Sequence, residues 1–250
     1  MKARRVGGKI ALRQKYQGTQ GQIALIFTLM RFLILSMWLV LPAIMPAGAD
    51  FTQSDPVKRW INHQCSVGSV TAVFVQERHL KALKHPIVNQ GKLWFKAPGF
   101  FRWELGSPAE SIAINRDGDL HLLRPLKKTG DRFSRDNTKK HSRSSAIHFL
   151  DIGFPESHKA FTEKFTVTSI TLKEGDYIFA AKVNDLRTNL ALRKVVFQVD
   201  AETLITRSIT LRFRDSSSVN TEFSGIRENI KLRDSIFDID LTGYTITDNE

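Results

Sequence analysis

Polar and apolar residues alternate along most of the chain between Val70 and Arg227. This period of two is typical of strands with one buried face. Short turns such as Asp117-Gly118 separate the alternating stretches and predict hairpins. About ten strands joined in this way predict a mainly β fold, with one strongly curved antiparallel sheet that forms an incomplete β-barrel. The strands are expected at Val70–Arg78, Asn89–Lys96, Phe101–Leu105, Glu110–Arg116, Asp119–Arg124, Phe165–Lys173, Tyr177–Val183, Leu192–Val199, Leu204–Arg214 and Val219–Arg227.

Two short helices are expected beside this sheet. Asp55 as N-cap and Pro56 at the first helical position predict a helix over Asp55–Ser66. Its apolar stripe would consist of Val57, Trp60, Ile61 and Cys65. A second helix is predicted at Ser144–Ile152, and we expect both helices to act as lids over the sheet.

Phenylalanine dominates the expected inner face of the sheet. Fifteen of the 17 Phe residues follow residue 49, and their rings supply apolar surface without a polar group. The aromatic residues assigned to this face are Phe74, Phe95, Phe101, Trp103, Phe179, Phe197, Phe213 and Phe223. Each could belong to an ordinary core. Together they suggest an apolar cavity, because a single curved sheet encloses more volume than its own side chains fill.

The first 49 residues have the pattern of a secretory leader. They contain seven Lys or Arg and no Asp or Glu, followed by the apolar run Phe32–Met45 and an Ala-x-Ala end at Ala49. We expect cleavage after Ala49, export to the periplasm, and a single domain over residues 50–250. A leader of ordinary length would begin at Met30. An uncleaved anchor is the alternative, although the run is shorter than the roughly 20 residues of a membrane span.

The expected removal of the leader lowers the net charge of the chain and changes which partners that charge suggests. The whole chain carries a formal charge of +12, which would suggest a nucleic-acid partner. Removal of the seven basic residues lowers this charge to +5, so we expect no nucleic-acid binding. The single cysteine, Cys65, excludes a disulfide within the chain and is expected to be a small buried apolar residue.

A basic segment interrupts the strand pattern between Lys127 and Arg143. Such a segment is either a solvated loop or a docking patch for an anionic partner. The residues of the predicted patch are Lys127, Lys128, Arg132, Arg135, Lys139, Lys140 and Arg143. The chain carries no nucleophile elbow, metal-ligand motif or phosphate-binding loop, so we expect neither an enzyme nor a bound metal or cofactor.

Two segments resemble the outer-membrane lipoprotein carrier (LolA-like) family. Val70–Gln76 is similar to its first strand, and Gly91–Glu104 follows its order of Gly, short strand, Pro, aromatic pair and Trp. Further similar positions are Pro108, Asp117-Gly118, Pro125, Asp200, Asn229 and Phe237. The chain also departs from the family, because Ala97 precedes Pro98 where a basic residue, thought to latch sheet to lid, is usual. Lys96 should point to the opposite face and would replace that residue poorly.

The resemblance implies a monomeric carrier for lipidated lipoproteins or other acylated cargo. Its partners would be an inner-membrane release complex and an outer-membrane acceptor. The acyl chains would lie in the cavity, which the resemblance places against the sheet residues Phe74, Phe95, Phe101, Trp103, Leu105, Ile112 and Ile114 and the lid residues Phe149 and Leu150. A lipid- or glycolipid-binding or envelope-sensing module without lipoprotein transfer is the alternative.

Overall fold

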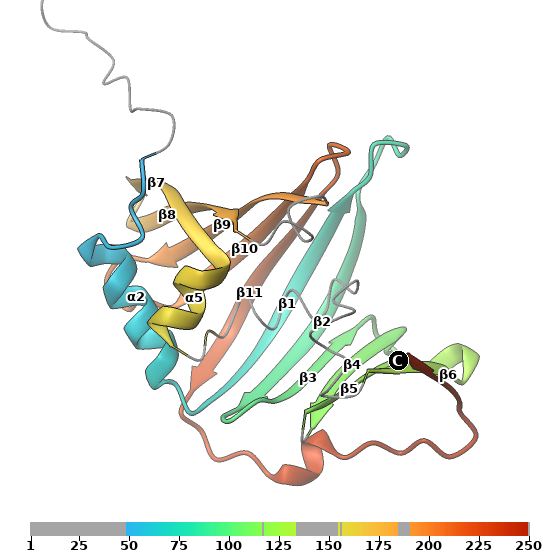
Figure 1. Cartoon of the computed structure of the whole chain (residues 1–250). Helices are drawn as coiled ribbons and strands as arrows, with labels where there is room; N and C mark the ends of the chain where they lie inside the picture. The colour runs from blue at the N-terminus through green and yellow to red at the C-terminus, as the bar shows by residue number, and fades with distance from the viewer. Residues whose placement is uncertain (1–48, 117, 134–154, 156, 185–190, 250) are drawn as a thin grey trace, which may run out of the picture. The chain divides into compact units, whose positions relative to one another are not determined.

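Twelve strands form one sheet in the computed structural model, which describes residues 49–116, 118–133, 155, 157–184 and 191–249. The strand order is β12-β6-β5-β4-β3-β2-β1-β11-β10-β9-β8-β7, and the sheet curves without closing (Figure 1). Neighbours are antiparallel except β12, which pairs parallel to β6 at one edge. The bounds are β1 Ser69–His79, β2 Ile87–Lys96, β3 Phe100–Leu105, β4 Ser111–Arg116, β5 Asp119–Arg124, β6 Thr129–Phe133, β7 Phe165–Lys173, β8 Asp176–Val183, β9 Leu192–Asp200, β10 Thr206–Phe213, β11 Ser218–Glu228 and β12 Thr245–Asn249.

The ten predicted strands are present, and the expected fold class is confirmed. The alternation does not predict β6 or β12. The five residues of β6, Thr129–Phe133, lie within the basic segment and have only Phe133 as a large apolar residue. Strand β12 is equally short and depends on a parallel partner that lies more than a hundred residues away in the sequence. Local sequence carries little signal for such edge pairings.

Helix α2 spans Asp55–Ser66, as predicted, and buries Val57, Trp60 and Ile61 completely or almost so. Two details of the prediction are wrong. The N-cap is Ser54 rather than Asp55, so Asp55 begins the helix. Cys65 is exposed, because the turn of the helix brings Gln64 to the buried side instead. The thiol of Cys65 donates a hydrogen bond to the carbonyl oxygen of Pro155 at 3.3 Å.

A second helix, α5, spans His158–Lys164 and is not predicted by the sequence pattern. The side chain of Ser157 caps it by accepting a hydrogen bond from the amide of Ala160 at 3.1 Å. Helix α5 packs against α2 and β7. The expected helix Ser144–Ile152 lies outside the described residues. Among those residues, the structure holds no helix with the length and apolar character needed to cross a membrane.

The two helices lie in front of β7–β10 (Figure 1), and their aromatic rings belong to the core cluster there. The Trp60 ring lies 5.5 Å from Phe161 of α5, 5.4 Å from Phe179 of β8 and 4.7 Å from Phe197 of β9, measured between centroids. Its indole nitrogen donates to the hydroxyl of Thr206 at 3.0 Å. These contacts fix α2 to the inner face of the sheet, and all four rings are at most 1% exposed.

The outer face of β3 and β4 is covered by the C-terminal segment that follows β11, which we call the strap (residues 229–244). Its short helix η2, Asp234–Phe237, packs against both strands. Phe237 is fully buried, with its ring 5.6 Å from that of Phe100. Lys96 forms an ion pair with Asp234 of the strap, which confirms that Lys96 points to the outer face.

Candidate functional site

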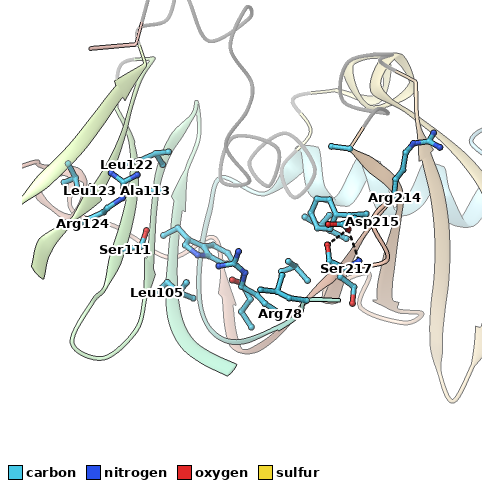
Figure 2. A pocket seen from close by; sticks show the side chains of 18 of the residues that line it. Arg78, Leu105, Ser111, Ala113, Leu122, Leu123, Arg124, Arg214, Asp215 and Ser217 are labelled. Atoms are coloured by element: carbon cyan, nitrogen blue, oxygen red, sulfur yellow. Dashed lines mark hydrogen bonds between the residues drawn. The ribbon is translucent and has the colours of Figure 1, made fainter. Parts of the chain in front are cut away.

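An open cavity of about 680 Å³ lies on the inner face of the sheet, away from the helices. One wall is formed by β3, β4 and β5 and the other by β10, β11 and their connecting turn, with β1 between them (Figure 2). The lining consists of Gln76, Arg78, Leu80, Phe101, Trp103, Leu105, Ser111, Ala113, Leu122, Leu123, Arg124, Ala191, Leu211, Phe213, Arg214, Asp215, Ser217, Ser218 and Val219. None of these residues belongs to α2 or α5. Helix α2, Asp55–Ser66, covers the inner face of the sheet as expected, but it lies over β7–β10 and contributes no residue to this lining.

The floor of the cavity depends on a stacked pair of rings. Phe74 and Trp103 lie 3.8 Å apart between centroids, with 25° between their planes. Gly91 makes this stacking possible, because it stands opposite Phe74 on the neighbouring strand β2. A Cβ atom at Gly91 would lie 2.0 Å from the Phe74 ring. The glycine that opens the family-like segment thus leaves room for the Phe74 ring to reach Trp103.

Polar side chains gather around the apolar lining. Arg78 comes from the end of β1, and Figure 2 places it between the two walls. Arg124 forms an ion pair with Asp131 at 2.9 Å. The Asp215 carboxylate accepts hydrogen bonds from the hydroxyl and the amide of Ser217, at 2.6 and 2.9 Å. These bonds lower the pKa of Asp215 and keep it charged.

The structure separates the expected lining residues into three groups. Phe101, Trp103 and Leu105 line the cavity. Phe74 is buried under Trp103, and Phe95 shares their face of the sheet, as its pairing with Phe101 shows, but lies outside the lining.

The remaining two sheet residues, Ile112 and Ile114, lie on the opposite face. The reason is register, because Ala113 rather than either isoleucine stands opposite Trp103. Ile114 pairs with Arg102, whose guanidinium donates to the carbonyl oxygen of Ile236 in the strap at 2.9 Å. Ile112 and Ile114 thus belong to the face that packs against the strap, which corrects their assignment to the cavity.

The cavity wall formed by β10 and β11 was not part of the predicted lining, although Phe213 was expected on the inner face. Leu211, Phe213 and Val219 line the cavity opposite Trp103 and Leu105. The alternation places Leu211 and Phe213 on an apolar face, which is the only signal the sequence offers. Which strands face one another across the curved sheet follows from the pairing of β1 with β11, and no local pattern encodes that pairing.

The predicted docking patch is described only in part. Lys127 is exposed, and the ammonium group of Lys128 lies 4.7 Å from the centroid of the Tyr244 ring. Arg132 forms an ion pair with Asp119 at 2.5 Å, which neutralises much of its charge. The other members, Arg135, Lys139, Lys140 and Arg143, lie outside the described residues, as do the expected lid residues Phe149 and Leu150.

The described part of the chain contains no group of three or more His, Cys, Asp or Glu residues placed to hold a metal ion. The described cavity is instead lined by apolar side chains with polar ones around them. The family model of the outer membrane lipoprotein carrier protein LolA matches residues 65–240. The chain therefore belongs to the LolA family. No sequence relative was found among curated proteins.

Several solved structures are similar to this chain at low sequence identity. A LolA superfamily protein from Nitrosomonas europaea is 8% identical, with a TM-score of 0.41 over 72% of this chain and 96% of that chain. A putative outer membrane lipoprotein-sorting protein domain from Vibrio parahaemolyticus is 12% identical, with a TM-score of 0.44 over 73% and 94%. The MucA/MucB complex of Pseudomonas aeruginosa is matched at 11% identity and a TM-score of 0.41, over 76% of this chain and 62% of that chain.

Proposed function

We propose that this protein is a periplasmic carrier that holds the acyl chains of lipoproteins in the cavity and moves them from the inner to the outer membrane. The observation that supports the proposal is the cavity itself, whose volume of about 680 Å³ falls in the range of small-molecule pockets, roughly 300–1,000 Å³. Eleven of its 19 lining residues are apolar, nine of them Leu, Phe, Trp or Val and two Ala, and the other eight are polar or charged. Membership in the LolA family supports the same function.

The energetics of the cavity suit a reversible carrier. Each methylene of an acyl chain that leaves water contributes about 0.8 kcal/mol, and a single long chain therefore binds reversibly rather than permanently. The cavity is open to one side, which allows the chain to enter without unfolding any strand. Gln76 and Arg78 lie beside the apolar walls and would face the polar end of the cargo. No acid–base or nucleophilic step is part of this function.

The test is mass spectrometry of apolar material extracted from the protein after export with its own leader. Wild-type protein should release acylated lipoprotein or lipid. Val219→Trp places an indole in the cavity and should reduce the extracted material at least fivefold. Val73→Trp is the matched control, because Val73 is 47% exposed on the outer face, and it should change nothing. Equal loading of both variants would contradict the cavity as the binding site.

Transfer separates the carrier from the alternative of a lipid-binding or sensing module. The purified protein, loaded with a triacylated lipoprotein, would be incubated with outer-membrane vesicles. A carrier releases its lipoprotein to the vesicles. Retention of the lipoprotein by protein that binds it well would overturn the transfer step and favour the sensing module, whereas extraction of free lipids alone would favour a lipid or glycolipid cargo.

A further inference from the structure

The hairpin between β1 and β2 exposes an unusual amount of apolar surface. We call residues 78–88 the β1–β2 tip. Within it, Leu80 is 36% exposed, Leu83 48%, Ile87 40% and Val88 52%. These four are half of the large apolar residues that are clearly exposed in the described chain. Exposed apolar residues that cluster in this way mark a surface that contacts another apolar phase, whereas scattered ones need no explanation.

Basic side chains alternate with these apolar residues. Lys81 and Lys84 are exposed, and neither forms an ion pair with another residue in the described parts of the chain. Arg78, at the start of the tip, is exposed as well. The acidic residue next to the tip, Glu77, lies 3.5 Å from the ring of His79. The tip therefore presents a positive charge together with its leucines.

A second hairpin lies at the same end of the sheet. His79 pairs with Ser218, so the β10–β11 turn stands beside the tip, and both project beyond the neighbouring strands in Figure 1. The hydrogen bonds from Ser217 are the main cause of the lowered pKa of the Asp215 carboxylate in that turn, and the charge of Lys81 contributes less. Two carboxylates, of Glu77 and Asp215, stand beside the four basic side chains of Arg78, Lys81, Lys84 and Arg214, which leaves this end of the sheet positive.

The shape of the tip favours a bilayer over a protein groove. The leucines of this projecting hairpin stay partly exposed on the protein itself, but they can insert among lipid headgroups and upper acyl chains. Lysines at the same depth would meet anionic phosphates, which attract basic residues near a membrane surface. The charge of the tip is thus complementary to an anionic bilayer.

The tip is also continuous with the cavity. Arg78 and Leu80 belong to the cavity lining as well as to the tip. A protein that docks through the tip would hold the mouth of its cavity at the membrane surface, where an acyl chain leaves or enters the bilayer. We propose that the β1–β2 tip docks this protein onto anionic phospholipid surfaces, with Leu80, Leu83 and Val88 inserted and Lys81 and Lys84 at the headgroups. This docking does not depend on which acylated cargo the cavity carries.

The experiment is co-sedimentation of the protein with vesicles. Vesicles of phosphatidylethanolamine and phosphatidylglycerol should bind the wild-type protein, and the binding should weaken as salt is added. Vesicles of phosphatidylcholine alone should bind it much less. The double variant Lys81→Gln/Lys84→Gln should bind the anionic vesicles about 25-fold less tightly, which corresponds to about 1 kcal/mol for each lysine. Leu83→Ser should reduce binding about fivefold.

A matched control comes from the β7–β8 hairpin, where Leu172 is 63% exposed and Lys173 is exposed beside it. Leu172→Ser/Lys173→Gln removes the same residue types elsewhere and should leave vesicle binding unchanged. All variants change exposed positions, and unchanged melting curves would show that they fold. The proposal would be overturned if the tip and control variants lost vesicle binding equally, or if the tip variants bound vesicles as well as the wild type does.

The two proposals fail separately. If Lys81→Gln/Lys84→Gln loses vesicle binding but still carries extractable acyl chains, membrane docking requires the tip and acyl-chain binding does not. If Val219→Trp is empty yet binds vesicles as the wild type does, the cavity and the tip are distinct sites. Wild-type protein that binds no vesicle but is captured through the tip by a membrane protein would overturn lipid docking in favour of a protein partner.

Discussion

The inner face of the sheet has two halves that consist of similar residues but meet different surroundings. In the helix-covered half, Trp60 of α2 and Phe161 of α5 pack with Phe179 and Phe197, and all four rings are at most 1% exposed. In the cavity half, formed by the lining strands β1, β3–β5, β10 and β11, neither described helix contributes to the lining. An aromatic inner face is thus a core or a binding surface according to what covers it.

The largest difference between the halves should appear on truncation of Trp60. Trp60→Ala removes a 1% exposed indole, its three ring contacts and its hydrogen bond to Thr206, and should lower the free energy of unfolding by about 3–5 kcal/mol. Trp94→Ala, at a half-buried outer-face position, should cost less than about 1.5 kcal/mol. Urea denaturation measures both. A similar cost for the two would mean that α2 is not a principal part of the core.

Enlarging one valine in each half sharpens the comparison. Val195 on β9 is fully buried, so Val195→Trp should destabilise the protein by more than about 3 kcal/mol through overpacking. Val219 on β11 faces the cavity, and Val219→Trp should cost less than about 1 kcal/mol because open space receives the indole. Thermal or urea unfolding of the two variants measures this difference in stability. If both are equally destabilised, the cavity half is packed as a core.

The smallest effect concerns two aspartates, one near each half. Asp200 accepts bonds from the amides of Thr203 and Glu202 and from Arg207, which lower its pKa below the ordinary 3.8. A carboxylate with a lowered pKa stabilises the folded state above pH of about 4, and this stability is lost as the pH falls through the folded-state pKa. Asp200→Asn should therefore flatten the loss of stability in acid.

Asp215 gives the matched measurement at the cavity mouth. Its pKa is lowered mainly by Ser217, so Asp215→Asn should flatten the acid loss less than Asp200→Asn does. Unfolding midpoints in urea, recorded between about pH 6 and pH 3, would compare the two variants. A larger effect at Asp215 would show that the mouth of the cavity is held more firmly than its hydrogen bonds indicate.

Individual residues show which features of the fold the sequence predicts and which it does not. Periodicity predicts the ten long strands and helix α2, because burial on one face selects residues at a spacing of two or of 3.6. The same periodicity shows that Ile112 and Ile114 share one face of β4. It does not show whether that face is the inner or the outer one. Register decides that, since a shift of one residue exchanges the two faces of a strand.

Arg207 shows a related limit. The alternation along β10 places Arg207 on the same face as Ile209 and Leu211, yet its guanidinium forms ion pairs with Asp176 at 3.1 Å and with Asp200. The pairing of β10 with β9 is irregular between Thr206 and Ser208, and this bulge turns Arg207 toward the aspartates. A bulge depends on how a strand pairs with its neighbour, so the sequence of β10 by itself does not predict it.

Local periodicity predicts the fold class, the long strands and the first helix, and an ordered set of motif residues indicates the family. The tertiary structure alone decided where the cavity lies, that β10 and β11 form its second wall, and that the strap buries Phe237 behind β3 and β4. The physical reason is that these features arise between segments far apart in the chain. Their contacts depend on strand order and register, which no single segment contains.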